Sequence, residues 1–276
     1  MRESMTASAS SATGSELGQY VYGIVEAGLQ PPPTAGVDDR RPARSVAAGQ
    51  LAALVGDVSL AEFGEGRLEE NLSEPGWLEQ KVRAHEAVLE AAQETGTVLP
   101  FRFGIVYLSE SHVQEMLVRE RATLLAALAR VRGKREWGVK GLVEHARLAE
   151  WLGASEPGRD EQQPESEGAA YLAKRQLEQR ARAESERLLL GVAEDSHARL
   201  SACASEAALN PRPRTTSRRA GRDLFLNGVY LVEGSREEEL KQAVEDLSAR
   251  LGDRGVRYEL TGPWPPYNFV ATEVPA

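Results

Sequence analysis

The sequence predicts an α+β fold of two ferredoxin-like-type domains, each an antiparallel sheet covered by helices, with a long amphipathic helix in the C-terminal half. Three observations predict it. Short β-branched and aromatic runs alternate with helical periodicity across residues 19–150. An acidic, Pro-containing stretch, residues 151–168, lacks either pattern and is expected to be a linker, or a loop preceding a long helix. Residues 169–276 then repeat the order helix, strand, helix, strand.

Composition narrows the class of protein. Of the 276 residues, 41% are hydrophobic and 27% are charged, which is ordinary for a globular protein with a core. The formal net charge of −9 argues against nucleic acid or an anionic membrane as partner. A single cysteine, Cys203, excludes an internal disulfide and fits a reducing compartment. No secretory signal and no run of about 18 apolar residues is present, so a cytoplasmic location is expected.

The N-terminal elements follow from local pattern. Residues 1–18 are rich in Ser, Ala and Thr and are expected to form a disordered tail. Residues 20–25 are β-branched and aromatic, which predicts a strand. Residues 46–58 suit two short strands with a turn near Gly49, although their alanines leave a helix open.

Two helices are predicted next. The first begins at Ser73-Glu74-Pro75 and ends at Gly96. Its apolar stripe consists of Leu78, Val82, His85, Leu89 and Ala92. Residues 97–108 are expected to be extended, residues 109–133 to form the second helix, and residues 137–143 another strand. We therefore expect a sheet covered on one face by two helices in domain 19–150.

The C-terminal half is expected to begin with a helix over residues 169–209, which contain no Pro and one Gly. A basic turn with five arginines follows at residues 212–222. Residues 223–233 predict a strand, residues 236–251 a helix and residues 256–262 a final strand. The turn resembles a nucleic-acid patch over a short window, but in an acidic chain a solvated or partner-docking loop is favoured.

Motifs for catalysis are missing from the sequence. It contains no phosphate-binding GxxxxGK[ST] loop, no GxGxxG, no GxSxG and no HExxH, and its four histidines lack ligand spacing. The sequence therefore predicts no enzyme, no cofactor and no metal site. His85 lies on an apolar stripe, which favours a hydrogen-bonded core histidine, and Cys203 is expected to be an inert thiol.

Three segments carry residues that simple packing does not require. Arg102 interrupts the aromatic-rich run 99–104, either because alternation turns it outward or because it binds something. Lys140 follows a turn and a Trp, where it could be solvated or paired with a carboxylate. The final segment, residues 262–270, combines three prolines with Trp, Tyr and Phe; pinning across a core is favoured over a partner-binding strip.

Together these segments resemble the GvpL/GvpF family of gas vesicle proteins across residues 20–270. The motifs that carry the resemblance, in order, are Tyr20-Val21-Tyr22-Gly23-Ile24-Val25, Pro100-Phe101-Arg102-Phe103-Gly104, Glu136-Trp137-Gly138-Val139-Lys140, Ala170-Tyr171-Leu172-Ala173-Lys174-Arg175 and Gly262-Pro263-Trp264-Pro265-Pro266-Tyr267-Asn268-Phe269-Val270. The chain departs from the family pattern at Phe101, at Ile105 and in the Arg- and Pro-rich turn 211–222.

The resemblance implies an accessory or minor structural protein that is needed for gas vesicle formation. It further implies binding of the small hydrophobic shell subunit and of other gas vesicle accessory proteins, a location at the gas vesicle, and no catalysis. The acidic charge and the motif search add the expectation of no cofactor, no nucleic acid and no lipid membrane. On this basis the candidate partner-binding residues are Arg102, Trp137, Lys140, Tyr171 and Arg175.

Two other functions stay open on sequence alone. Tandem ferredoxin-like domains also serve as general protein- or ligand-binding modules, because one fold hosts many functions. An enzyme is the other alternative, with Arg102 and Lys140 as an anion clamp and Glu136 or His85 as base. It requires those side chains to meet in one pocket.

Overall fold

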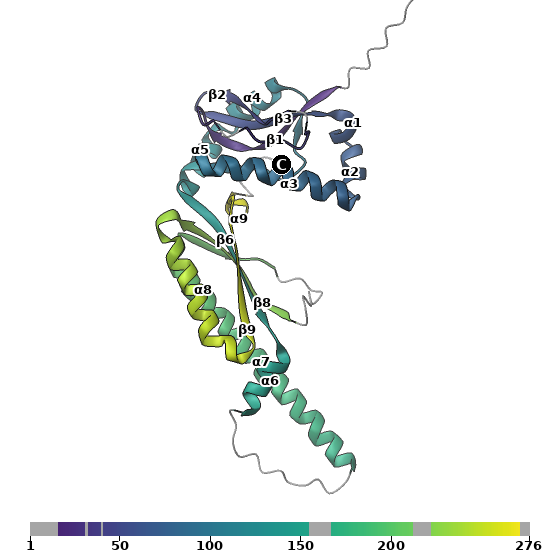
Figure 1. The fold of residues 1–276 in the computed structure, drawn as a ribbon, viewed down its shortest axis with the longest axis vertical. Helices are drawn as coiled ribbons and strands as arrows, with labels where there is room; N and C mark the ends of the chain where they lie inside the picture. The colour runs from purple at the N-terminus through teal and green to yellow at the C-terminus, as the bar shows by residue number, and fades with distance from the viewer. Residues whose placement is uncertain (1–15, 31–32, 40, 155–166, 212–221, 271–276) are drawn as a thin grey trace, which may run out of the picture. The chain divides into compact units, whose positions relative to one another are not determined.

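The computed structural model describes residues 16–30, 33–39, 41–154, 167–211 and 222–270. The chain divides into two compact units, residues 1–130 with 270–276, and residues 131–269. Each unit has its own antiparallel sheet and its own helices (Figure 1), so the predicted α+β class with two such domains is confirmed. Within the described residues, no helix is both long and apolar enough to cross a membrane.

The first unit is built on a five-stranded sheet of order β2-β3-β1-β4, with β5 added to β1. Its strands are β1 (Leu17–Glu26), β2 (Arg44–Ala48), β3 (Leu51–Ser59), β4 (Val98–Pro100) and β5 (Val106–Tyr107). The predicted turn near Gly49 joins β2 to β3, and the positive φ of 66° suits glycine there. Antiparallel pairing with β1 thus overrides the helix preference of the alanines.

Helices cover both faces of this sheet, not one face as expected. Figure 1 shows α3 (Pro75–Thr95) and α4 (Glu110–Arg119) on opposite sides of it. Eight consecutive residues of β1 are buried, which requires cover on both faces. Two short helices, α1 (Leu60–Phe63) and α2 (Arg67–Leu72), were not predicted.

The helix ends are mostly those expected from capping. Gly96 ends α3, and the Ser109 hydroxyl caps α4 by accepting from the backbone N–H of His112. The predicted helix 109–133 is two helices, because the chain leaves helical geometry at Glu120 before α5 (Arg121–Val131). The predicted tail 1–18 is too long at its end, since Leu17 and Gly18 belong to β1; residues 1–15 lie outside the described residues.

The second unit has a four-stranded sheet of order β7-β8-β6-β9. Its strands are β6 (Lys134–Val143), β7 (Glu206–Leu209), β8 (Asp223–Glu233) and β9 (Val256–Trp264). Its helices are α6 (His145–Ala154), α7 (Glu167–Ala202) and α8 (Glu237–Leu251), and α9 (Tyr267–Val270) follows β9. The strand order, with the first and third strands in the centre, is that of a ferredoxin-like sheet.

The predicted domain boundary at residue 150 differs from this division. β6, which we expected to end the domain 19–150, lies in the centre of the second sheet and pairs with both β8 and β9. Part of the expected linker 151–168 is also helical, since residues 151–154 belong to α6 and 167–168 to α7; residues 155–166 lie outside the described residues. The unit to which β6 belongs depends on its strand partners β8 and β9. These partners are distant in sequence, so the local pattern around β6 cannot identify them.

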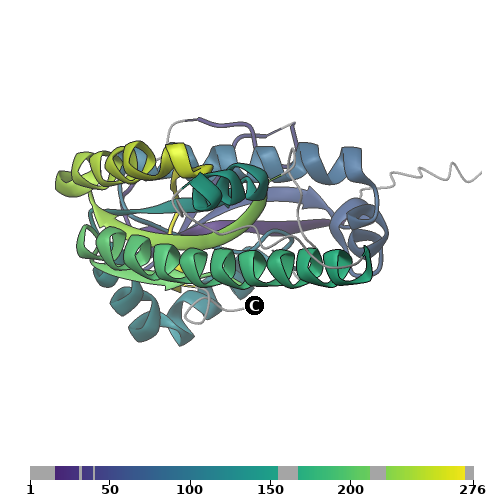
Figure 2. The same cartoon turned by 90° about the horizontal axis from the view of Figure 1, so that it is seen from below.

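The long helix ends earlier than its predicted end at residue 209. α7 stops at Ala202, and Ser205 then donates its backbone N–H to Leu231 O, which starts the ladder of β7 on β8. Figures 1 and 2 show α7 and α8 along the same sheet, and one core joins them to it. Ser196 of α7 lies 2.5 Å from the Tyr258 hydroxyl in that core, which ties the helix to β9.

Candidate partner-binding surfaces

Arg102 lies in the first unit, on a loop between β4 and β5 that is attached to β1. Phe101 donates its N–H to Tyr22 O at 2.8 Å, and Ile105 O accepts from Val21 N–H at 2.9 Å. Phe101 is buried whereas Arg102 is exposed, on a loop and not on the strand that was expected there. We call residues 101–105 the Arg102 loop. Its two ends are hydrogen-bonded to β1, and the Arg102 side chain between them is exposed.

A buried histidine, His85, is linked to this loop through the Tyr20 hydroxyl. His85 is 1% exposed and its Nδ1 lies 2.9 Å from the Tyr20 hydroxyl oxygen, which accepts from the backbone N–H of Gly104. Burial lowers the pKa of His85 to about 4, against the opposing effect of its hydrogen bond to the Phe101 backbone. The predicted core histidine is confirmed. Because it is enclosed, His85 has no access to a substrate, which removes it as the base of an enzyme.

Lys81 is a second buried group, one that sequence analysis missed. It is 8% exposed, and its Nζ donates to Val37 O at 2.7 Å and lies 3.2 Å from a carboxylate oxygen of Glu62. The Phe63 ring centroid is 5.7 Å from the same Nζ. Lys81 therefore joins α3 to α1 and to the loop before β2. The only sequence signal is a lysine one position before an apolar residue of the α3 stripe, and that is too common to identify it.

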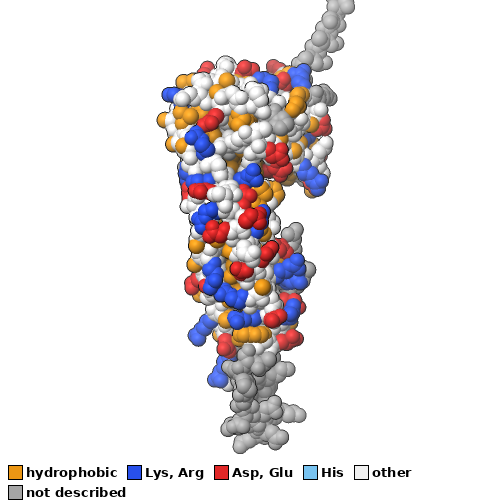
Figure 3. Space-filling model, turned by 60° about the vertical axis from the view of Figure 1, so that its left-hand side comes forward, with side chains coloured by type: hydrophobic (Ala, Val, Ile, Leu, Met, Phe, Trp, Pro, Cys, Tyr) orange, Lys and Arg blue, Asp and Glu red, His pale blue; other side chains and the backbone are white. Residues whose placement is uncertain are grey.

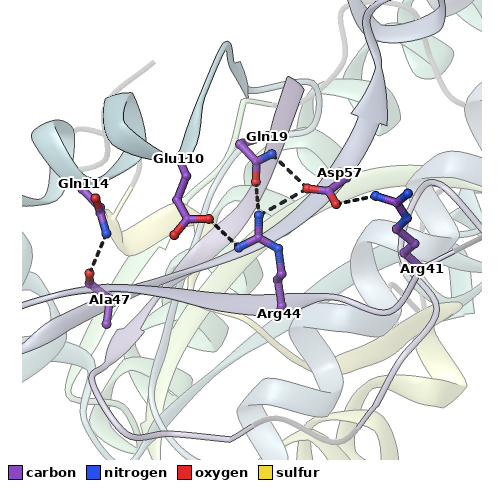
Figure 4. Close-up of polar contacts among 7 residues, drawn as sticks. All are labelled: Gln19, Arg41, Arg44, Ala47, Asp57, Glu110 and Gln114. Carbon is purple, nitrogen blue, oxygen red and sulfur yellow. Dashed lines mark hydrogen bonds and ion pairs between the residues drawn. The ribbon is translucent and has the colours of Figure 1, made fainter. Parts of the chain in front are cut away.

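Figure 4 shows a polar cluster on the same sheet, centred on Asp57 of β3. Arg41 donates to one oxygen of Asp57 at 2.8 Å, while Arg44 and Gln19 reach the other at 3.2 and 2.9 Å. Arg44 also pairs with Glu110 of α4 at 3.0 Å. We call these five residues the Asp57 cluster; it fastens α4 to the edge strand β2.

The charge of Asp57 is stabilised by its neighbours. Burial alone would raise the pKa of this carboxyl, but the hydrogen bonds from Gln19, Arg41 and Arg44 outweigh it and lower the pKa. The unfolded chain therefore takes up this proton at a higher pH than the folded chain does. Asp57 contributes stability above its ordinary pKa of 3.8, and this contribution is lost as the pH falls further.

Asp57→Asn is expected to lower the free energy of unfolding by about 1–2 kcal/mol, because the amide accepts more weakly from the two arginines and carries no charge. The estimate is modest because Arg41 and Arg44 are 60% and 41% exposed. Urea unfolding followed by circular dichroism measures it, with the exposed Asp39→Asn as control. Equal urea midpoints for the two variants would contradict a stabilising role.

In the second unit, Trp137 and Lys140 do not form one patch. Trp137 is 5% exposed and belongs to the core beneath α7 and α8, with Lys241 Nζ 5.6 Å from its ring centroid. Lys140 is an odd number of residues further along β6, so it lies on the opposite face of the sheet, where it is half-buried next to Glu259 of β9. Trp137, one of the predicted partner-binding residues, therefore has its ring enclosed by the core.

Glu136, next to Trp137, holds the C-terminal segment. Its buried carboxylate accepts from the backbone N–H of Asn268 at 2.8 Å and from the Asn268 side-chain amide at 2.6 Å. Burial raises the pKa of Glu136, and these two hydrogen bonds oppose that rise. The favoured interpretation, a pinned C-terminal segment, agrees with these contacts. Since its oxygens are occupied and enclosed, Glu136 is also no base for an enzyme.

The other two candidates lie on α7. Arg175 is exposed, and Tyr171 is in the helix but its side chain lies outside the described residues. On the face of the second unit seen in Figure 3, acidic and basic side chains are intermixed, so no single sign of charge dominates there. The basic turn 212–222 lies outside the described residues except for Arg222. No group of three or more His, Cys, Asp or Glu side chains in the described part of the chain could hold a metal ion.

Comparison with known proteins identifies relatives that match nearly the whole chain. The profile of the family described as gas vesicle synthesis protein GvpL/GvpF matches residues 18–271. Gas vesicle protein L of a Streptomyces species is 32% identical over 91% of this chain and 92% of its own length. Gas vesicle protein F2 of Halobacterium salinarum is 28% identical over 95% of this chain and 96% of its own length.

A solved structure shares the fold. The crystal structure of gas vesicle protein GvpF from Anabaena sp. superposes with a TM-score of 0.65 at 21% identity, covering 92% of this chain and 95% of that one. Together with the family profile over almost the whole chain, the two-sheet α+β fold and the sequence relatives lead to one assignment. This chain belongs to the GvpL/GvpF family of gas vesicle proteins.

Proposed function

We propose that this protein acts in gas vesicle assembly by binding the hydrophobic shell subunit and keeping it soluble until it joins the growing wall. A wall with one water-repelling face is built from subunits that must expose apolar area while they are free. Each Å² of that area costs about 25 cal/mol in water. A helper that covers it transiently lowers this cost without any catalytic step.

The Arg102 loop is the observation that carries the proposal. Its guanidinium is exposed, while Phe101, Gly104 and Ile105 are fixed to β1 by backbone or tyrosine hydrogen bonds. Because the backbone of this loop is already held in place, the loop loses little conformational entropy when it binds a partner. Arginine also presents several donors in a planar fork, which suits carboxylate or carbonyl oxygens of a partner chain. We assign Arg102 to such a contact with the shell subunit.

The exposed Arg175 on α7 supports a second contact, together with Tyr171 one helical turn before it. Packing of a helix into a groove of a partner chain is a recognised mode of binding. Lys140 is half-buried, and we assign it only a supporting role. Trp137 is not proposed as a contact, because it lies in the core.

Co-expression of the shell subunit with the tagged full-length protein tests the proposal. The wild type is expected to carry soluble subunit through purification, and Arg102→Ala is expected to recover about tenfold less, a loss typical of one good charged contact. Arg83→Ala is the matched control, since Arg83 is also a solvent-exposed arginine of the first unit, with 78% of its side chain accessible.

Each outcome has a definite meaning. Loss with Arg102→Ala alone, at unchanged circular dichroism, supports direct binding through the Arg102 loop. Equal recovery with both variants would rule out the Arg102 contact, and Tyr171→Ala and Arg175→Ala would then test α7. If wild type recovers no subunit at any salt concentration, direct binding of the subunit is wrong.

A further inference from the structure

The second unit contains an open groove that none of the contacts above uses. It has a volume of about 330 Å³, and α7, the end of β6 and the start of β8 form its walls. The lining side chains are Val143, Leu189, Leu190, Leu224 and Phe225, with His145, Glu186 and Asp223. We call it the α7–β8 groove. Its mixture of aliphatic, aromatic and a few polar side chains is typical of binding sites.

The apolar wall of the groove includes an exposed leucine, Leu190. Leu189 packs into the core of the unit, whereas the adjacent Leu190 is 57% exposed at the groove. Exposed leucines are common singly, but this one adjoins four other apolar side chains around a hollow. Covering Leu190 would therefore remove apolar area from water at little cost in ordering.

The polar wall contains two carboxylates and one histidine. Asp223 pairs through Oδ2 with Nε2 of His145 at 3.1 Å, while its Oδ1 is buried and has no hydrogen-bond partner among the described residues. Glu186 adds a second carboxylate, which is paired with the exposed Arg182 at 3.1 Å. The two carboxylates outnumber the one histidine of this wall, and a cationic donor is the group that carboxylate oxygens bind most strongly.

We propose that the α7–β8 groove binds a peptide segment of a partner chain in which a large apolar side chain adjoins an arginine or lysine. The apolar side chain fills the space beside Leu190 and Phe225, and the cation pairs with the carboxylate of Asp223, whose side chain is 30% exposed. Charge complementarity identifies this occupant, since two carboxylates and one histidine form the polar wall. This site is independent of the Arg102 loop, which belongs to the other unit.

Methyl NMR of the full chain tests the proposal with two probes, acetyl-Phe-Leu-Arg-amide and the same peptide with citrulline, an uncharged analogue of arginine. The arginine peptide is expected to shift the methyl signals of Val143, Leu189 and Leu190, and to bind about tenfold more tightly than the citrulline peptide. Asp223→Asn should bring the two affinities together, because it removes the charge that distinguishes them.

Leu190→Arg should abolish binding by filling the groove with a like charge. Leu209→Arg is the matched control, since Leu209 is also 57% exposed but lies on β7 outside the groove. Arg102→Ala should bind both peptides with the affinity of wild type. The test of the α7–β8 groove is therefore independent of the test of the proposed function. No methyl shift at millimolar peptide, or equal binding of both peptides by wild type, would overturn the proposal.

Discussion

Between pH 6.5 and about 4, the free energy of unfolding of the first unit is expected to fall by on the order of 3 kcal/mol because of His85. In the unfolded chain this imidazole takes up a proton as the pH falls through 6.5. In the folded chain burial keeps it neutral down to about pH 4. The unfolded state therefore binds more protons in this window, and stability decreases with decreasing pH. Asp57 acts only below its ordinary pKa of 3.8, so the two effects separate on the pH axis.

Hydrogen exchange of the Arg102 loop, which His85 supports directly, measures this effect. The comparison is between wild type and His85→Gln at each pH, so that the intrinsic pH dependence of exchange cancels. The stability advantage of wild type should shrink steadily as the pH falls from 6.5 towards 4. His112→Gln, at an exposed histidine of the same unit, serves as control. A constant difference between wild type and His85→Gln across this range would show that His85 does not stay neutral in the folded chain.

Glu136→Ala is expected to release the C-terminal segment from β6. The substitution removes the acceptor of two short hydrogen bonds from Asn268, one of them from the backbone. Hydrogen bonds to a charged group contribute about 1.5–3 kcal/mol each, so the free energy of local opening should fall by about 3 kcal/mol. That fall corresponds to roughly a hundredfold larger open population. Amide exchange of Asn268 and Phe269 measures it.

Glu259→Ala is the matched control for this prediction. Glu259 is a carboxylate of the same sheet, on β9, but is only half-buried and has no part in holding Asn268. A double-mutant cycle with Asn268→Ala separates the side-chain hydrogen bond from the backbone one. If Glu136→Ala and Glu259→Ala exchange alike at Asn268, the segment is held by burial of its aromatic side chains and not by Glu136.

Local sequence pattern predicted the position of some side chains of the candidate site but not of others. The apolar stripe of α3 placed His85 inward, and the structure agrees. For Arg102 local pattern left two possibilities open, outward alternation or binding, and the structure shows an exposed side chain on a loop. The same kind of reasoning did not separate Trp137 from Lys140. A strand with one residue in the core and another on the opposite face has the same composition whichever face is covered, and only packing decides which face that is.

Local sequence pattern was enough to predict the α+β class and elements such as β8 and α8. Their predicted spans, residues 223–233 and 236–251, agree with the structure to within one residue. Periodicity and chain-stopping residues act within a few positions, so they are visible locally. Three features became visible only in the folded chain: β6 belongs to the second sheet, residues 206–209 pair with β8 instead of extending α7, and Asp57 binds two arginines. These features depend on partners distant in sequence, and pairing and burial between such partners outweigh local preference.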